Sequence, residues 1–205
     1  MASNDYKFVS HWRVRGTRQE VVDVFSDPRE LPRWWRAFVM EVLNVEPGGE
    51  GALGERVTLH VKSWLPYQLV WTFKVVEARA LDGFAVDVTG DLEGLSKWTF
   101  TQDGEYVNIR NDWTVRAHLA IVRYLSWLLK PAFAFNHRWA MKQGEISLQI
   151  EMDRRRARTE QERALIPAPP LPTTSSWAPL GLASLGIVLA LGSAAYLLTR
   201  PHAQS

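Results

Sequence analysis

The feature that most constrains this chain is an uncharged apolar run at residues 178–198, close to the C-terminus. A helix of this length spans roughly 30 Å, about the hydrocarbon thickness of a bilayer. A buried core helix of equal length would normally show a polar face, and this run has none. Trp177 and Tyr196 lie near its two ends, where amphipathic rings favour the lipid headgroups. The sequence therefore predicts a single transmembrane anchor at residues 178–199, followed by a short tail at residues 200–205.

A basic cluster precedes this run and bears on topology. It consists of Arg154, Arg155, Arg156 and Arg158. Because cytoplasmic flanks of a span carry an excess of Lys and Arg, we expect the globular part to lie in the cytoplasm. The same arginines could meet anionic headgroups, or they could complement the dipole of a solvated helix end, and both readings stay open.

Composition divides the rest of the chain. Residues 1–158 have the length and apolar content of one domain, whereas residues 159–177 are proline-rich and predict a semi-rigid tether. A ligand for proline-binding domains is the alternative for this segment. The chain has no cysteine, and its formal net charge of +2 is too small to indicate nucleic acid as a partner. No secretory signal is visible at the N-terminus.

Alternation of apolar and polar residues predicts a mainly antiparallel sheet. Residues 6–15 read as a strand, and two short helices follow, one capped by Thr17 and one opened by Pro28. Six further strands are expected at residues 39–45, 55–63, 68–78, 83–89, 95–101 and 105–119. Their apolar positions share one face, which indicates a sheet covered on one side only.

Two helical segments close the domain. Residues 120–130 predict a short amphipathic helix that ends before Pro131, and residues 132–158 predict a longer one. Phe135, Trp139, Ile146 and Ile150 lie near one stripe of the longer helix, which we expect to cover the sheet. The predicted class is α+β.

Several local sequences occur in an order known from one superfamily. They are FSDP at residues 25–28 leading to WW at 34–35, GDLEG at 90–94 followed by Trp98, WTV at 113–115, and NHRWAM at 136–141 followed by GE at 144–145. With the order of the elements, they make residues 6–152 resemble the START/Bet v1-like (SRPBCC) superfamily, in its polyketide cyclase/dehydrase branch. The resemblance implies a helix-grip fold with a deep, largely apolar cavity for a lipid, polyketide, sterol-like or aromatic molecule.

The candidate cavity residues come from the predicted inner faces of the strands and of the long helix. They are Leu59, Trp71, Phe73, Val86, Trp98, Phe100, Asn111, Trp113, Phe135 and Trp139. Aromatic side chains suit the wall of an apolar pocket, and the alternative is ordinary core filling. A cavity above about 300 Å³ would fit a small-molecule site.

Asn111 is the sharpest polar anomaly, because it shares the phase of Ile109 and Trp113. Its amide should therefore be paired within the protein or face a polar group of a ligand. His60, His118 and His137 have no carboxylate or second histidine at a catalytic or metal-binding spacing. We therefore expect no metal and no cofactor, and the sequence leaves catalytic residues unknown.

Three functions remain open from sequence alone. The first is membrane-anchored binding of a hydrophobic small molecule, with membrane lipids as the second partner. The second is a polyketide cyclase/dehydrase-like enzyme, and the third is a membrane-tethered interaction module whose tryptophans fill the interior. Gly186, Ala190 and Ala194 repeat at four-residue spacing, which also allows a homodimer through the anchor.

Overall fold

A computed structural model describes residues 5–65, 67–117 and 120–173 of the chain. Within these ranges, seven antiparallel strands form one sheet in the order β1-β7-β6-β5-β4-β3-β2. The strands are β1 (Asp5–Arg15), β2 (Val39–Glu46), β3 (Arg56–Lys62), β4 (Gln68–Ala78), β5 (Gly83–Gly90), β6 (Leu92–Asp103) and β7 (Tyr106–Ala117). The predicted strands are confirmed, with small differences at their ends.

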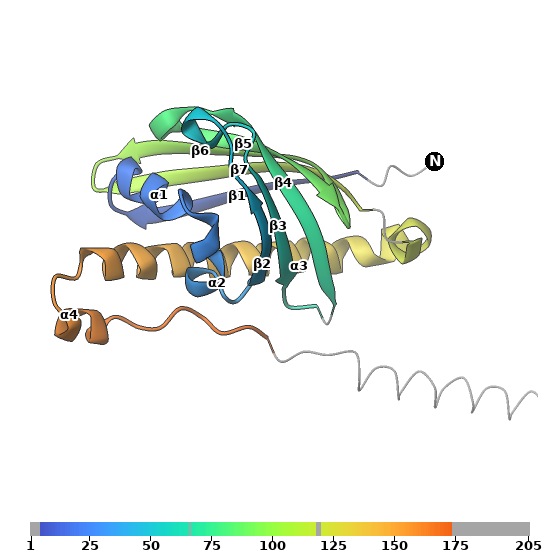
Figure 1. The fold of residues 1–205 in the computed structure, drawn as a ribbon. Coiled ribbons are helices and arrows are strands. Elements are labelled where there is room, and N and C mark those ends of the chain that lie inside the picture. The colour runs from blue at the N-terminus through green and yellow to red at the C-terminus, as the bar shows by residue number, and fades with distance from the viewer. Residues whose placement is uncertain (1–4, 66, 118–119, 174–205) are drawn as a thin grey trace, which may run out of the picture. The chain divides into compact units, whose positions relative to one another are not determined.

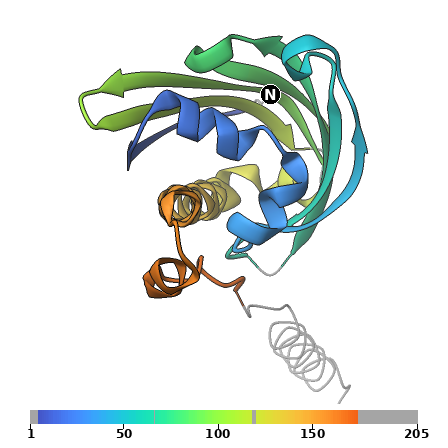
Figure 2. The same ribbon diagram turned by 60° about the vertical axis from the view of Figure 1, so that its left-hand side comes forward.

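The helices lie between β1 and β2 and after β7. They are α1 (Arg18–Phe25), α2 (Leu31–Trp34), α3 (Ala120–Arg156) and α4 (Glu160–Leu165), with short 3-10 turns η1 (Pro28–Glu30), η2 (Glu50–Ala52) and η3 (Ala80–Asp82). Figure 1 shows α3 running along the sheet, and Figure 2 shows the sheet curving over α3 with α1 and α2 inside the curve. This is the helix-grip arrangement expected from the sequence.

The long helix does not break at Pro131. The sequence predicted an end there, but α3 is a single helix of 37 residues with Pro131 inside it. Proline removes one backbone hydrogen bond and disfavours a helix without forbidding it. The prediction of two separate helices was therefore wrong.

Irregular pairing helps the sheet to curve. The register of β2 against β3 shifts twice, between Val39 and Glu41 and between Val42 and Asn44. The register of β4 against β5 shifts between Val75 and Glu77. Such bulges bend a strand and increase its local twist, and this half of the sheet is the part that turns around the helix.

The C-terminal end of α3 is held to the first helices by ion pairs. Glu151 is 1% exposed and accepts hydrogen bonds from Arg33 (2.8 and 2.7 Å) and from Arg155 (2.7 Å). Arg156 donates to both carboxylate oxygens of Glu20 (2.6 and 3.0 Å). Two of the clustered arginines thus bind carboxylates of their own domain, an arrangement that neither sequence-based reading had included.

The proline-rich segment lies against the domain in its first part. Thr159 caps α4, and the chain then continues without helix or strand through residues 166–173. Pro169 is buried, and its carbonyl accepts hydrogen bonds from Arg36 at 3.0 and 2.5 Å. Residues 1–173 form one compact unit. We call residues 166–173 the strap.

The predicted anchor lies outside the described residues, and so does its stripe of small residues. Within the described ranges, none of the helices combines the length and the apolar composition that crossing a bilayer requires.

Candidate functional site

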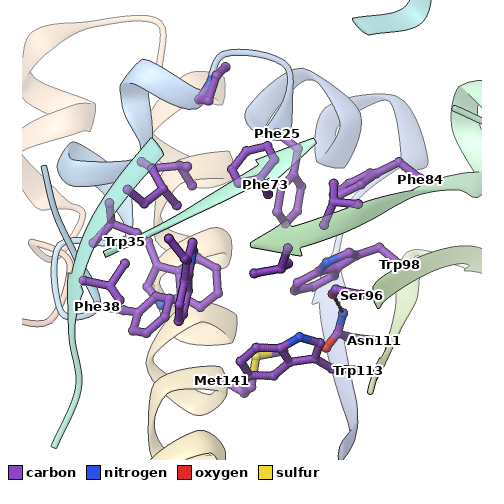
Figure 3. Close-up of a pocket in the computed structure, with 18 of the residues that line it drawn as sticks. Phe25, Trp35, Phe38, Phe73, Phe84, Ser96, Trp98, Asn111, Trp113 and Met141 are labelled. Carbon is purple, nitrogen blue, oxygen red and sulfur yellow. Dashed lines mark hydrogen bonds between the residues drawn. The ribbon is translucent and has the colours of Figure 1, made fainter. Parts of the chain in front are cut away.

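A cavity of about 610 Å³ lies between the concave face of the sheet and the helices α1, α2 and α3. Its wall is largely apolar and rich in aromatic rings, several of which are labelled in Figure 3. The volume falls inside the usual range for small-molecule sites. The hollow that the sequence predicted is therefore present.

Eight of the ten candidate residues line this cavity. They are Leu59, Trp71, Phe73, Val86, Trp98, Phe100, Asn111 and Trp113. All eight come from strands β3 to β7, from stretches outside the bulge in β4, where side chains alternate between the two faces and one phase sets the inward positions. Whether these side chains contact a ligand stays a prediction.

The two candidates on the long helix do not line the cavity. Phe135 is 44% exposed and packs edge-on against Trp64, and Trp139 is half-buried outside the cavity wall. The inward face of α3 instead carries Phe133, Asn136, His137, Ala140 and Met141. These residues follow the helical period, whereas Phe135 and Trp139 lie roughly 160° from His137 at 100° per residue. The stripe predicted for this helix was out of phase.

Other wall residues were missed because they lie on short helices and at strand ends. Trp35 and Phe38 contribute one group of rings, with centroids 5.1 Å apart. The centroid of the Phe38 ring also lies 5.8 Å from that of Trp71. Phe25 and Phe84 contribute another, with centroids 5.8 Å apart. The aromatic density of residues 25–38 was the available signal, but so short a helical segment has no reliable phase.

Four polar side chains gather at one place in the wall, which we call the polar corner: Ser96, Asn111, Trp113 and His137. Asn111 is 2% exposed, and its Nδ2 donates to the hydroxyl of Ser96 at 2.7 Å (Figure 3). The indole N–H of Trp113 is buried and has no hydrogen-bond partner among the described residues. Asn111 is therefore paired, as one of the two sequence-based readings required, and it also lines the cavity.

His137 is part of the same corner. It is 9% exposed, its ring stacks on Phe8 with centroids 4.3 Å apart, and its Nε2 shares a hydrogen bond of 3.1 Å with the hydroxyl of Ser10. Burial lowers the pKa of His137 to about 4, and the charge of Arg138 acts in the same direction. The imidazole is therefore neutral at pH 7 and can accept a proton or a hydrogen bond.

A carboxyl group lies at a different part of the wall. Glu55 lines the cavity close to η2, and burial raises its pKa, with Arg29 opposing and Asp27 reinforcing that shift. Gly51, Ala52 and Ala80, which also line the cavity here, are exposed, so the cavity reaches the surface on this side. The wall thus carries one acidic group away from the polar corner.

Comparison with known proteins supports the fold. The chain resembles the Zhui aromatase/cyclase from Streptomyces sp. R1128, with 16% identity, a TM-score of 0.57, and coverage of 75% of this chain and 97% of the other. It resembles the di-domain ARO/CYC BexL from the BE-7585A biosynthetic pathway, with 13% identity, a TM-score of 0.57, and coverage of 76% and 51%. A protein from Thermus thermophilus matches at 15% identity and a TM-score of 0.52, with coverage of 70% and 97%.

The chain shares the helix-grip fold of these structures, which is the fold that the resemblance of its sequence implied. No family model and no curated protein matches it by sequence.

Proposed function

We propose that this protein binds a hydrophobic small molecule in the cavity between the curved sheet and α3. The single observation that carries the proposal is a volume of about 610 Å³ enclosed by a mainly apolar, aromatic wall. An interior meant only for stability would be close-packed, with few voids larger than a water molecule. An interaction module with its tryptophans packed into the interior does not account for this space.

The polar corner narrows the class of ligand. A ligand that fits has a flat or elongated apolar body, as a lipid, polyketide or aromatic compound has, and one polar end. Because the Trp113 indole offers a buried N–H, that end should carry a hydrogen-bond acceptor such as a carbonyl or hydroxyl oxygen. The neutral imidazole of His137 also carries one N–H, which can donate a hydrogen bond to such an oxygen.

We further propose that the domain works at a membrane, on its cytoplasmic side. The support is the uncharged run at residues 178–198 and the arginines that precede it. Hydrophobic ligands partition into bilayers, so a binding domain held there meets them at high local concentration.

Mass spectrometry and a binding titration test the proposal. Residues 1–173, the compact unit, should retain a co-purifying hydrophobic molecule in native mass spectra and should bind the dye 1-anilinonaphthalene-8-sulfonate at one saturable site. Val86→Trp places an indole inside the cavity and should weaken dye binding at least about tenfold, which is 1.4 kcal/mol. The matched change Val76→Trp, on an exposed side chain of β4, should leave binding unchanged. Equal effects of the two variants would show that the dye binds elsewhere.

A cyclase or dehydrase is the second candidate. It is favoured by the likeness to solved aromatase/cyclases and by a neutral, buried histidine in the cavity wall. In such an enzyme, His137 would accept a proton from an activated carbon while Asn111 holds a carbonyl oxygen. Incubation with a linear poly-β-ketone thioester should then yield a ring product that has lost one water. His137→Phe should abolish this product without abolishing binding, whereas absence of any product with the unaltered protein would leave binding as the function.

A further inference from the structure

The cavity has an end near the β3–β4 connection that carries an exposed pair of aromatic rings. Trp64, in the connection, is 46% exposed, and Phe135, on α3, is 44% exposed. Their ring centroids are 5.1 Å apart in an edge-on arrangement. Large rings that stay in contact with water at a surface are typical of sites that meet another apolar phase. We call Trp64 and Phe135 the aromatic rim.

The aromatic rim borders the cavity directly. Ser63 and Asn136, the sequence neighbours of the two rings, both line the cavity. The side-chain oxygen of Asn136 accepts a hydrogen bond of 2.9 Å from the backbone N–H of Leu65, which joins the connection to the helix. A surface that covers the aromatic rim therefore covers this end of the cavity.

The strap leads the chain to the same place. The carbonyl of Thr173 accepts a hydrogen bond of 2.9 Å from Lys62 Nζ, and the hydroxyl of Thr173 donates to the carbonyl of Ser63 at 2.8 Å. Together with the bonds from Arg36 to Pro169, these contacts hold both halves of the strap on the domain. The described chain therefore ends beside the aromatic rim and not at the far end of α3.

Chain length then limits where the uncharged run can start. Ala178 follows Thr173 by five residues, which span at most about 18 Å when fully extended. That distance is shorter than the hydrocarbon thickness of a bilayer, about 30 Å. If residues 178–198 enter a bilayer, Thr173 lies within this distance of the point of entry, and Thr173 is bonded to Ser63, the residue before Trp64.

Charge at this end suits an anionic lipid surface. The three segments that meet here, residues 62–68, 131–142 and 166–173, contain no aspartate or glutamate. They contribute the basic residues Lys62, Arg138 and Lys142, of which Arg138 is exposed, Lys62 donates to the carbonyl of Thr173, and Lys142 is paired with Glu145 one turn further along α3. Basic residues near a bilayer containing anionic lipids each favour binding.

From these observations we propose that the β3–β4 end of the domain docks on a lipid bilayer, with Trp64 and Phe135 at the level of the headgroups. The strap fixes this orientation, and a hydrophobic ligand passes between cavity and bilayer beside the half-buried cavity residues Lys62 and Tyr67, at the end opposite the opening near Gly51 and Ala52, without crossing bulk water. The ligand route rests on the proposed function, whereas the docking itself does not require a ligand.

The lack of cysteine in the chain allows a direct test. The full-length protein carries Trp64→Cys or Phe135→Cys, each labelled with a nitrobenzoxadiazole fluorophore, and is reconstituted into vesicles of phosphatidylcholine and phosphatidylglycerol. The matched control is Val76→Cys, whose native side chain is 44% exposed on β4. Lipids with a spin label near the headgroup should quench the labels at 64 and 135 at least about threefold more than the label at 76. Equal quenching, or a protein that does not float with the vesicles, overturns the proposal.

A second variant tests the strap and separates the two proposals. Arg36→Ala removes the bonds to Pro169 and should lower the quenching at position 64 toward that at 76, and unchanged quenching would overturn the orienting role of the strap. Dye binding is measured on the same vesicles. If selective quenching is lost while saturable dye binding is retained, only the docking proposal is contradicted. If the domain docks but shows no saturable dye binding, only the proposed function is contradicted. Docking that occurs only when a membrane protein is added would identify a protein partner and overturn the lipid proposal.

Discussion

Asn111 and Ser96 form a buried hydrogen bond of 2.7 Å between neighbouring strands β7 and β6, within a cavity whose wall is otherwise largely apolar. A buried amide and a buried hydroxyl satisfy each other there, which keeps the cost of both polar groups low. The pair also gives the cavity a fixed polar point against which a ligand can be oriented.

The first prediction concerns this pair. Asn111→Ala leaves the Ser96 hydroxyl without its donor, and we expect the free energy of unfolding to fall by about 1–3 kcal/mol. Ser96→Ala should lower the free energy of unfolding less in the Asn111→Ala protein than in the native protein. The difference between the two effects, the coupling energy, should be about 1 kcal/mol. Urea denaturation of residues 1–173 and of the three variants measures the cycle. Strict additivity would show that the bond contributes nothing to stability.

The second prediction concerns Gly144 on α3. A Cβ at this position would lie 2.6 Å from a ring carbon of Trp35 and 2.7 Å from ring carbons of Trp12. Both rings are buried and pack edge-to-face with centroids 5.5 Å apart, so neither can move freely. Overpacking of this kind costs about 1–3 kcal/mol, against about 1 kcal/mol gained when alanine replaces glycine in a helix.

We therefore expect Gly144→Ala to lower the thermal midpoint. Gln143→Ala, at a half-buried position one residue earlier, is the matched control and should change the midpoint little. Calorimetry of both variants measures the difference. A Gly144→Ala protein as stable as the native one would mean that α3 can shift away from the two tryptophans without cost.

The sequence predicted the sheet well because a strand has only two faces. Once Asn111 shared the phase of Ile109 and Trp113, its inward direction followed without further information. The same rule placed Leu59 and Trp71 in the cavity wall. Alternation is a local signal that holds wherever the strands carry no bulge, and it fails in β2, whose burial pattern does not alternate where its register shifts.

The helix α3 was harder because apolar residues occur on more than one of its faces. Phe135 and Trp139 suggested one stripe, but the inward face includes the polar residues Asn136 and His137. A pattern based on hydrophobicity assigns such residues to solvent. The contact of the strap with Arg36 and Lys62 was equally hidden, since it joins residues more than 100 positions apart through backbone carbonyls.

The third prediction concerns the pH dependence of stability. The folded protein lowers the pKa of His137 to about 4, from an ordinary value near 6.5, so the unfolded chain binds more protons between these values. The contribution of the neutral His137 imidazole to the free energy of unfolding is therefore fully present above pH 6.5. It is lost as the pH drops toward 4, and the loss is at most about 3 kcal/mol. His137→Gln should remove this part of the pH dependence.

Two measurements check it. Urea midpoints at several pH values should converge for the native protein and His137→Gln as the pH falls, and parallel curves would contradict the prediction. NMR titration of the imidazole should give a midpoint near 4. Among the described residues, Ser10, Phe8 and Trp113 contact the ring, and none of these three carries a carboxylate that would favour the protonated imidazole.

The fourth prediction concerns the ion pair that joins α1 to the end of α3. Hydrogen bonds from Arg156 lower the pKa of Glu20 to about 2, from an ordinary value of 4.5, against the opposing effect of burial. Because the folded state favours the carboxylate, its contribution is present above pH 4.5 and is lost as the pH falls toward 2. Both side chains are about one third exposed, so screening limits this contribution to about 1 kcal/mol.

Glu20→Gln should flatten the loss of stability between pH 4.5 and 2 while keeping the helix cap, since the amide oxygen can still accept from the Thr17 N–H. Arg156→Gln should flatten the same region, and the double variant should add little to either single change. Guanidinium chloride would screen the pair, so urea is the denaturant of choice. In 1 M NaCl the difference between native and Glu20→Gln proteins should shrink, because a partly exposed pair is screened by salt. A difference that persists undiminished would mean that Glu20 acts through the neutral hydrogen bonds of the cap and not through its charge.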